Sequence, residues 1–502
     1  MRTLYRASRV HTLSPYGGGD WLLVDGRHVE RAGSGEPPEA DRVVDLPGAT
    51  ILPGFVDAHV HLSATGMKGD GLDLSPAGSK EELLGLVREY VDGRDGPVLG
   101  AGFDESSWDD PTLPTMTELD GVSLQPILLV RTDGYLSLAN ERALELSGAL
   151  EHEGALRDPG GRPTGLLKER ANSQAQRWYH ASLDPGAIQD AQLRAAGLAV
   201  SRGVTTVQEM AMPDKQGRGD VEVLLDHLER LPVDCVVYIA DMDLPWVMER
   251  GLPRAGGDLC LDGSLGARTA ALLQPYSDHD GGGTLELDDD TLVEFLHNAH
   301  LAGLQVGLHV IGDAAIEQAL RAWERVHGAL DSRGRRHFRA RRHRLEHFEM
   351  ASLHQVEWAA GLGLAVSIQP AFDAFWGHPG GMYERRLGEE RARTMNPFQT
   401  LMARGLEVGA GSDTPVTPID PMYGIWALEN HHDPSQRIGR EDAIRLFTVG
   451  AARLGHLEKK GRLEPGSSAD LAAYEVDPFD VPDPRDLRPV LTVSRGREVF
   501  AR

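Results

Sequence analysis

His59 and His61 stand one residue apart at the end of an apolar run that covers residues 51–61. Because successive side chains of a strand point to opposite faces, both imidazoles would lie on the same side. Two neutral imidazoles on one face can share a metal ion. Two ordinary histidines of the core or the surface would give the same pattern, so the pair needs support from the rest of the chain.

Four further side chains that can bind a metal follow apolar runs elsewhere. They are Glu209, His309, His347 and Asp413. Each is weak support alone, because a histidine at the end of a strand is usually just a hydrogen-bonded side chain. Their meaning depends on whether the strands that carry them end at the same place.

The middle of the chain alternates apolar runs with helical stretches, such as residues 291–302, 313–328 and 351–361, which is typical of βα units around a parallel sheet. We expect eight strands, at residues 51–61, 204–210, 233–240, 258–262, 304–310, 343–347, 364–369 and 406–411. Eight such units predict an α/β fold of the TIM-like (β/α)8 barrel type. The active site of such a barrel lies at the C-terminal ends of the strands, where the candidate metal ligands would converge.

The two ends of the chain have a different character, with short strands and tight turns. Residues 1–52 and 460–502 are expected to form one composite β-sandwich domain. The barrel would occupy residues 53–459 and would be about 100 residues longer than a typical barrel. The excess lies at residues 63–165, which carry strand and helix patterns of their own, so we expect an inserted subdomain after the first strand.

The composition limits the partners. The 502 residues carry a net charge of −25, and so acidic a surface repels phosphate backbones and anionic lipids. We therefore expect neither nucleic acid nor a membrane as a partner. The chain shows no apolar run near the ~20 residues that cross a bilayer, and its first residues lack the apolar core of a signal peptide. Cys235 and Cys260 fit buried free thiols of a cytoplasmic protein.

Several motifs give the chain a resemblance to a known family. The stretch PGFVDAHVH at residues 53–61 is similar to the opening motif of the amidohydrolase superfamily, and residues 307–315, 344–347, 411–416 and 461–471 resemble its later motifs. The stretch DGSLGARTAAL at residues 262–272 is similar to a narrower branch, which contains the YtcJ-like proteins and N-substituted formamide deformylase. Residues 102–108, 131–140 and 163–165 resemble the same branch.

The resemblance implies a metal-dependent hydrolase with His59, His61, His309, His347 and Asp413 around the metal. The chemistry of these groups agrees with that role. Neutral imidazoles suit zinc, and zinc lowers the pKa of a bound water to about 7, so hydroxide is available at neutral pH. Asp413 can take the proton of that water and pass it to the leaving group. A histidine that is not a ligand, such as His347, can polarise the substrate carbonyl.

One position departs from the family pattern. Relatives in this branch often carry a carbamylated lysine that bridges two metals, four residues before the Asp-Gly-Ser motif, and this chain has Asp258 there. We therefore expect a single ion, with zinc favoured over iron or manganese. Its expected ligands are His59, His61, His309 and Asp413.

Two carboxylates near the expected centre have open roles. Glu209 could replace the missing bridge or serve as a fifth ligand, or it could be a salt-bridged loop residue. Asp57 shares a strand face with His59 and His61. It could accept a hydrogen bond from an imidazole, or it could cap the local backbone.

Contacts with a substrate are expected from the loops around the centre. Arg268 could pair with a carboxylate, and the apolar run after the seventh strand could line a pocket. Side chains of the inserted stretch could form its roof. The candidates are Arg268, Trp108, Arg131, Asp133, Tyr135, Phe372 and Trp376. Packing within loops would explain the aromatic residues after the seventh strand equally well.

These features predict an enzyme that hydrolyses an amide-like carbon–nitrogen bond of a small molecule with metal-activated water. The same ligands would serve a deaminase that acts on an amidine-like ring, and the sequence does not separate the two. A catalytically inactive scaffold on the same barrel would lack ligands, whereas all five core positions are present here. Because relatives are often dimers, a homodimer is a further expectation.

Overall fold

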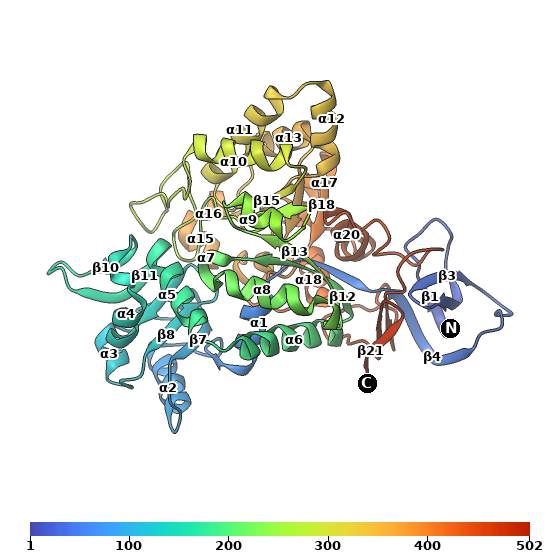
Figure 1. Cartoon of the computed structure of the whole chain (residues 1–502), viewed down its shortest axis with the longest axis horizontal. Helices are drawn as coiled ribbons and strands as arrows, with labels where there is room; N and C mark the ends of the chain where they lie inside the picture. Colours follow the sequence, from blue (N-terminus) through green and yellow to red (C-terminus); the bar gives the residue numbers. More distant parts are fainter.

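Both ends of the chain lie in one seven-stranded sheet. The structure, a computed structural model, describes residues 1–502. The strand order is β21-β20-β19-β4-β1-β2-β3, and the bounds are β1 (Arg2–Val10), β2 (Gly19–Asp25), β3 (His28–Gly33), β4 (Arg42–Pro53), β19 (Leu471–Tyr474), β20 (Leu491–Ser494) and β21 (Arg497–Ala501). Figure 1 shows these strands on the right, near both termini. The folding of this sheet into a sandwich stays a prediction.

Eight strands from the middle of the chain form two parallel sheets. Their orders are β13-β12-β5 and β14-β15-β16-β17-β18. The bounds are β5 (Phe55–Val60), β12 (Val204–Ala211), β13 (Asp234–Ile239), β14 (Arg254–Ala255), β15 (Gln305–Val310), β16 (Arg344–His347), β17 (Ala365–Ile368) and β18 (Glu407–Ala410). The sheets meet on one side through a parallel bridge between Val60 and Thr414. They meet on the other through a 2.8 Å backbone hydrogen bond from Gly256 to Ile239.

The first expected strand, at residues 51–61, is divided at Gly54. Residues 51–53 belong to β4 and pair with β19, whereas β5 starts at Phe55 and pairs with β12. Only glycine fits at the division, because an added Cβ would lie 2.3 Å from Oγ1 of Thr205. One apolar run thus connects the terminal sheet to the parallel strands.

The fourth expected strand, at residues 258–262, is also irregular. Regular pairing with β15 is limited to β14. The expected stretch contains a single isolated bridge, between Cys260 and His309. The strand is interrupted by Gly256 and Gly257, whose φ angles of 69° and 83° favour glycine. Beyond them the chain stays beside β15, because the N–H of His309 donates to Leu259 at 3.0 Å and the N–H of Leu261 donates to His309 at 3.1 Å.

Helices pack on the outside of the parallel sheets. Their bounds are α6 (Pro185–Ser201), α8 (Arg218–His227), α9 (Leu244–Glu249), α10 (Asp289–Leu301), α11 (Asp313–Ala329), α12 (Ser332–Arg341), α13 (Leu353–Leu362), α17 (Phe398–Ala403), α18 (Pro421–Glu429), α19 (Arg440–Arg445) and α20 (Ala451–Leu454). α11 shows why: Ile316, Leu320 and Trp323 recur at helical spacing and are completely buried in the core of the parallel strands. The helices expected at residues 291–302, 313–328 and 351–361 correspond to α10, α11 and α13.

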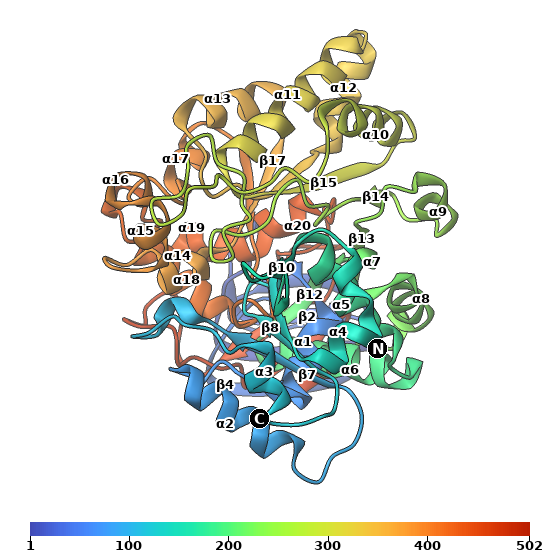
Figure 2. The same cartoon turned by 90° about the vertical axis from the view of Figure 1, so that its left-hand side faces the viewer.

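The stretch between the first two parallel strands has its own mixed sheet, with the order β10-β11-β9-β8-β7-β6. Its elements are α1 (Leu62–Asp70), β6 (Leu72–Asp73), α2 (Lys80–Val91), β7 (Val98–Phe103), α3 (Met116–Asp120), β8 (Ile127–Arg131), β9 (Leu136–Ala139), α4 (Glu141–Ser147), β10 (Ala155–Arg157) and β11 (Pro163–Lys168). Leu83, Phe103 and Ile127 belong to a core of its own. We refer to this segment as the inserted unit. Figure 2 shows it in front of the parallel strands.

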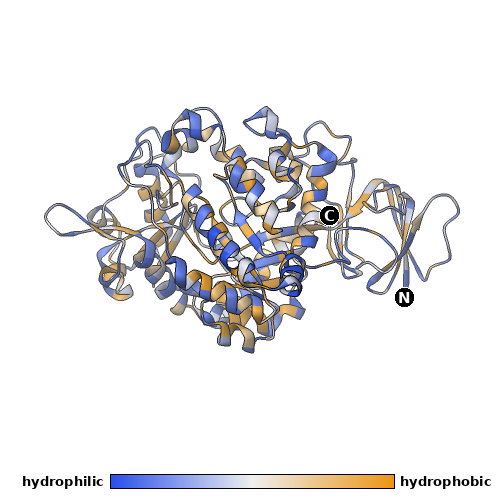
Figure 3. Cartoon of the chain, turned by 90° about the horizontal axis from the view of Figure 1, so that it is seen from above, coloured by the Kyte–Doolittle hydropathy of each residue, from blue (hydrophilic) through white to orange (hydrophobic).

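Hydrophobic and hydrophilic residues alternate along the helices (Figure 3), and the buried side chains are largely apolar. No helix combines the length and the apolar character that a membrane span requires. Both cysteines are free and partly buried.

Candidate metal centre

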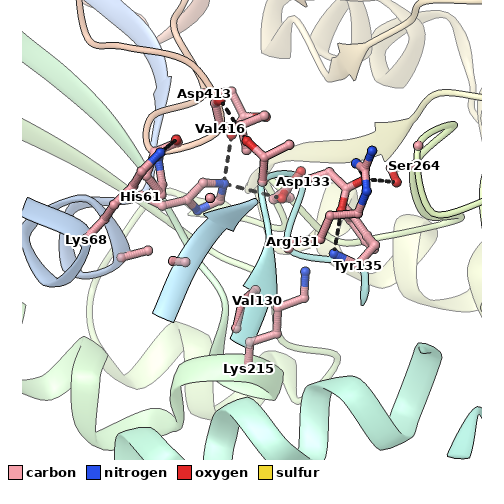
Figure 4. Close-up of a pocket in the computed structure, with 18 of the residues that line it drawn as sticks. His61, Lys68, Val130, Arg131, Asp133, Tyr135, Lys215, Ser264, Asp413 and Val416 are labelled. Carbon is pink, nitrogen blue, oxygen red and sulfur yellow. Dashed lines mark hydrogen bonds and ion pairs between the residues drawn. The ribbon is translucent and has the colours of Figure 1, made fainter. Parts of the chain in front are cut away.

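His59 and His61 aim the same ring atom, Nε2, at a common point. The Nδ1 atom of His59 lies 3.0 Å from Oε2 of Glu346, and Nδ1 of His61 lies 2.9 Å from the carbonyl oxygen of Met210. Since a carbonyl can only accept, the Nδ1 atom of His61 carries a proton in this bond. Both Nε2 atoms face Oδ1 of Asp413, at 3.5 Å and 3.1 Å. Figure 4 shows His61 and Asp413 together at one end of a cavity.

His347 and Asp413 reach the same point from the ends of two other strands. Nδ1 of His347 donates a 2.8 Å hydrogen bond to Oε1 of Gln369, and its Nε2 lies 3.4 Å from Oδ1 of Asp258. Both residues have positive φ angles, 69° for His347 and 56° for Asp413. Such angles are costly outside glycine and often occur at functional sites, where the surrounding structure holds them.

Asp258 lies in the centre of the imidazoles. Its carboxylate oxygens are 3.8 Å from Nε2 of His59, 3.6 Å from Nε2 of His61, 3.0 Å from Nδ1 of His309 and 3.4 Å from Nε2 of His347. Burial raises the pKa of this carboxyl, but the charge and hydrogen bond of His309 lower it more, so the pKa lies well below its usual range. The side chain at the position of the family lysine is therefore a buried carboxylate in contact with all four histidines.

His309 joins the centre through Asp258. Its Nδ1 contacts that carboxylate and also lies 3.2 Å from the hydroxyl of Tyr135, while Nε2 lies 3.1 Å from the carbonyl oxygen of Gly263. The donor atoms of Asp258, Cys260 and His309 all lie within 4.8 Å of one another. Both ring nitrogens of His309 thus have protein partners, whereas the Nε2 atoms of His59 and His347 have none.

The centre fits a divalent cation. Nε2 of His59, Nε2 of His347 and Oδ1 of Asp413 are buried and have no hydrogen-bond partner of good geometry. Two groups of donors each lie within 4.8 Å: His59, His61 and Asp413, and His59, Asp258 and His347. Imidazole nitrogens and carboxylate oxygens suit zinc and other first-row transition metals. Each group contains buried atoms without a partner, so a bound cation would supply an interaction that the protein itself does not.

The charges of the centre also favour a cation. Burial lowers the pKa of His61, but the hydrogen bond and charge of Asp413 raise it, to about 9. The pKa of His347 is raised to about 9 in the same way, against the effect of burial, by Asp258 and Asp413. The carboxylates thus attract positive charge, which protons or a metal can supply in competition.

Glu209 and Asp57 serve the backbone around the centre. Oε2 of Glu209 accepts a 2.7 Å hydrogen bond from the N–H of Leu62, and burial raises the pKa of Glu209 to about 8. Glu209 belongs to none of the donor groups within 4.8 Å. Asp57 accepts hydrogen bonds from the N–H groups of His59 and Ser412, at 3.2 Å and 2.9 Å. Of its two expected roles, the structure thus shows the backbone cap.

A cavity opens beside the centre and is lined by most of the expected substrate contacts. These are Arg131, Asp133, Tyr135, Phe372 and Trp376. Arg131 lines the cavity, but its guanidinium is already paired with three carboxylates of the protein. These are Asp104, Glu105 and Asp133, at 2.6 Å, 2.8 Å and 2.5 Å. The role of Arg131 is to hold the roof of the cavity together.

Two expected contacts lie outside the cavity, which corrects that part of the prediction. Nε1 of Trp108 donates a 2.7 Å hydrogen bond to the carbonyl of Ala77, and the ring is part of the core of the inserted unit. Arg268 pairs with Asp278 at 2.7 Å. Trp108 was expected in the roof as a side chain of the inserted stretch, and Arg268 was expected to pair with a carboxylate of the substrate, but neither side chain lines the cavity.

The sequence reasoning missed Asp258 as a member of the centre and Glu346 as the partner of His59. Asp258 carried a usable signal, because it is a carboxylate at the position where relatives carry a metal-bridging lysine. Glu346 did not, since alternation along β16 predicts that it points away from the face of His347. The positive φ of His347 breaks that alternation, so that both side chains reach the centre.

Comparisons with known proteins agree with this architecture. A model of the amidohydrolase family matches residues 42–500. The putative amidohydrolase YtcJ of Bacillus subtilis (strain 168) is 29% identical, over 94% of this chain and 92% of its own length. N-substituted formamide deformylase of Arthrobacter pascens is 25% identical, over 92% of this chain and 90% of its own. An uncharacterized metal-dependent hydrolase from Pyrococcus horikoshii OT3 has a TM-score of 0.76 and 26% identity, over 96% of this chain and 99% of that one.

The family match includes the parallel strands, the inserted unit and every donor of the centre, and in the terminal sheet it covers β4, β19, β20 and nearly all of β21. The solved relative shows that the same fold occurs in another protein of this kind. The chain therefore belongs to the amidohydrolase family.

Proposed function

We propose that this metal-dependent hydrolase cleaves an amide-like carbon–nitrogen bond of a small molecule. The observation that carries the proposal is the convergence of buried donor atoms without partners, on His59, His347 and Asp413, beside one cavity. The name of the relative from Arthrobacter pascens, N-substituted formamide deformylase, supports this class of bond. A carbonyl group that enters the cavity would lie beside these donors.

For the metal we propose one zinc ion, with iron or manganese as chemically suitable replacements. The donor atoms of His59, His61 and Asp413 lie within 4.8 Å of one another, and Asp258 faces the same imidazoles from the position of the family lysine. His309 remains bonded to Asp258 and Gly263 in this arrangement. A bound divalent ion would supply the Lewis acidity that makes water a nucleophile near neutral pH.

Asp413 is suited to move the proton. Burial raises its pKa, but the positive charges of His59 and His61 lower it further, so its pKa lies below the usual range and the side chain is ionised at neutral pH. An ionised carboxylate that lines the cavity can accept a proton from water and pass it to the leaving nitrogen. This transfer protonates the nitrogen, so that it can leave as an amine.

Tyr135 and His347 are suited to hold the carbonyl oxygen as it gains charge. Burial raises the pKa of Tyr135 well above its ordinary value, so the phenol keeps its proton and can donate. The Nδ1–H of His347 is fixed on Gln369, and its raised pKa of about 9 keeps a second proton on Nε2 near pH 7, so Nε2 can donate toward the centre. Donors that are already oriented stabilise an oxyanion most effectively.

We also propose that the two parallel sheets are parts of one distorted (β/α)8 barrel. The bridge between Val60 and Thr414 and the bond between Gly256 and Ile239 support it, since they join the sheets on both sides. The mouth of such a barrel would carry the centre, and the inserted unit would lie over it.

The proposal is tested by metal analysis and by a panel of N-acyl compounds. The purified protein should contain about one transition-metal ion per chain, and it should release a free amine or ammonia from some of the compounds. Release of ammonia from amidine-like rings without amine release would indicate a deaminase instead. Asp413→Asn should lower kcat by at least ~10²-fold and should leave the fold intact.

His337→Gln provides the matched control, because His337 is exposed on α12 and belongs to none of the donor groups of the centre. This variant should keep wild-type activity and metal content. Protein that binds no transition metal, or that hydrolyses no compound when fully loaded, would contradict the proposed function.

A further inference from the structure

The cavity has a second polar wall, formed by His180, Lys215 and Gln216. His180 lies on α5 (Glu169–Ala181), and the other two lie on α7 (Pro213–Gln216). The three residues are only 6%, 9% and 8% exposed. None of them is assigned a role in the proposed hydrolysis.

The polar ends of these side chains are unpaired within the protein. Nδ1 of His180 and Oε1 of Gln216 are buried and have no hydrogen-bond partner. Nζ of Lys215 forms no ion pair with a carboxylate, and its contact is with the ring of Tyr135, whose centroid is 3.9 Å away. Figure 4 shows the side chain of Lys215 extending toward Tyr135.

An unpaired ammonium at this depth is unfavourable for folding. Removing a charge from water is costly unless an opposite charge or good hydrogen bonds replace the water. The contact with the face of Tyr135 offsets only part of this cost. A negatively charged group of a ligand would supply the missing partner.

This wall is connected to the metal centre through a single side chain. The hydroxyl of Tyr135 lies 3.2 Å from Nδ1 of His309, and that atom lies 3.0 Å from Oδ1 of Asp258. Lys215 contacts the ring of the same tyrosine. A small molecule could therefore place one group at the centre and another at Lys215.

We propose that His180, Lys215 and Gln216 form a subsite for a carboxylate of the substrate, so that the preferred substrates are amides that carry a carboxylate, such as N-acyl amino acids. The proposal rests on the proposed hydrolysis of an amide-like bond, and it names the substrate class. Lys215 supplies the charge, and His180 and Gln216 supply neutral hydrogen-bonding groups.

The charge of the wall fits a single negative charge. Burial lowers the pKa of His180 to about 4, so this imidazole is neutral near pH 7 and Lys215 is the one cation of the wall. The other cations that line the cavity have protein partners: Lys68 donates to the carbonyl of Pro415 at 3.3 Å, and Arg131 is held by three carboxylates. This leaves Lys215 as the recognition residue in place of Arg268.

The test uses matched pairs of ligands on the full-length, metal-loaded protein. Each N-acetyl amino acid is paired with its neutral primary amide, and binding is measured by titration calorimetry or by competition while hydrolysis is followed in parallel. The wild type should bind the acids at least ten-fold more tightly than the amides. Lys215→Met should reduce this ratio to below two-fold, with little change for the amides.

Lys459→Met is the control, because it removes the same charge from an exposed position. It should keep the wild-type preference. The melting temperature supplies a second measurement: since Lys215 is an unpaired buried cation, Lys215→Met should melt no lower than the wild type without ligand, whereas loss of a structural lysine would lower it. Lys215→Gln repeats the test with a polar side chain should the methionine variant fold poorly.

Equal binding of acids and amides by the wild type, or an unchanged preference in both Lys215 variants, would overturn the subsite. These outcomes are separable from failure of the proposed function. Preference for acids without any hydrolysis would support the subsite and contradict the hydrolase. Equal binding and hydrolysis of acids and amides would support the hydrolase and contradict the subsite.

Discussion

Nδ1 of His59 lies 3.0 Å from Oε2 of Glu346, and both side chains are completely buried. Oε1 of the same carboxylate pairs with Arg344 at 2.8 Å. Glu346 therefore fixes the ring of His59 so that Nε2 faces the centre, and it also neutralises a buried guanidinium. A residue that binds neither metal nor substrate thus controls both the geometry of the centre and the stability of the strands below it.

Glu346→Gln should weaken the centre and the fold together. Loss of such a partner of a metal ligand typically lowers metal affinity by about 10–100-fold. Loss of one member of a buried ion pair costs about 3–5 kcal/mol, because Arg344 keeps its charge without a counter-charge. Competition with a chelator measures the first effect and denaturant unfolding the second. Glu458→Gln makes the same change in an exposed pair with Arg342 and should alter neither; a Glu346→Gln protein with wild-type metal affinity would show that His59 needs no such support.

Asp258→Asn tests whether the residue at the family lysine position is a ligand. The amide keeps the size of the side chain but removes the charge that faces His61, His309 and His347. We expect metal affinity to fall by at least ~10-fold, since ionised carboxylates are the better ligands, and metal content measured by mass spectrometry should fall with it. Asp290→Asn, at an exposed position on α10, should retain full metal content. Full metal content in Asp258→Asn would exclude Asp258 from the ligand set.

The periodic parts of the fold could be predicted from the sequence. Apolar runs predicted the strands, and helical spacing of apolar residues predicted α10, α11 and α13. Such patterns arise because the apolar face of each element is buried in a shared core. The division of the first strand at Gly54 could not be predicted, because the apolar run continues through it. It depends on the close approach of Thr205, a residue far away in the chain.

The centre shows the same limit. The residue types of His59, His61, His347 and Asp413 indicated a metal, and their positions at strand ends indicated where they meet. The unpaired state of Lys215 was not predictable, because it depends on which carboxylates the fold places nearby. Pairing between distant residues, rather than residue type, decides whether a polar group is free for a ligand.

His180 should make the protein less stable in mild acid. Burial lowers its pKa to about 4, whereas an unfolded histidine titrates near 6.5, so between these values the unfolded state binds more protons. Its contribution to stability is complete above pH 6.5 and is lost as the pH falls toward 4. The difference amounts to about 1 kcal/mol between pH 7.5 and pH 5.8, and pH 5.8 remains above the isoelectric point of about 5.2.

The measurement is urea unfolding at those two pH values. His180→Gln should lose about 1 kcal/mol less than the wild type on acidification, since glutamine does not titrate. His337→Gln removes an exposed histidine and should follow the wild type. An equal loss in His180→Gln and the wild type would mean that His180 is protonated in the folded protein at pH 5.8.

The roof of the cavity depends on contacts between the inserted unit and the loops of the parallel strands. Oδ2 of Asp133 accepts a 2.6 Å hydrogen bond from Ser264, and Oδ2 of Asp104 accepts a 2.9 Å hydrogen bond from Nε1 of Trp376. Both carboxylates are held in place by Arg131. The guanidinium of Arg131 thus stabilises both hydrogen bonds between the inserted unit and the loops of the parallel strands.

Arg131→Met should therefore loosen the inserted unit. The substitution leaves Asp104, Glu105 and Asp133 together without their cation, which should cost about 3–5 kcal/mol because these carboxylates have little access to water. Hydrogen exchange should become faster in β7 and β8, and the unfolding midpoint in urea should fall. Arg142→Met removes an arginine from an exposed pair on α4 of the same unit and should change stability by less than ~1 kcal/mol. If Arg131→Met had wild-type exchange and stability, the carboxylates would have to be protonated or paired elsewhere, and the roof would be held by its apolar core alone.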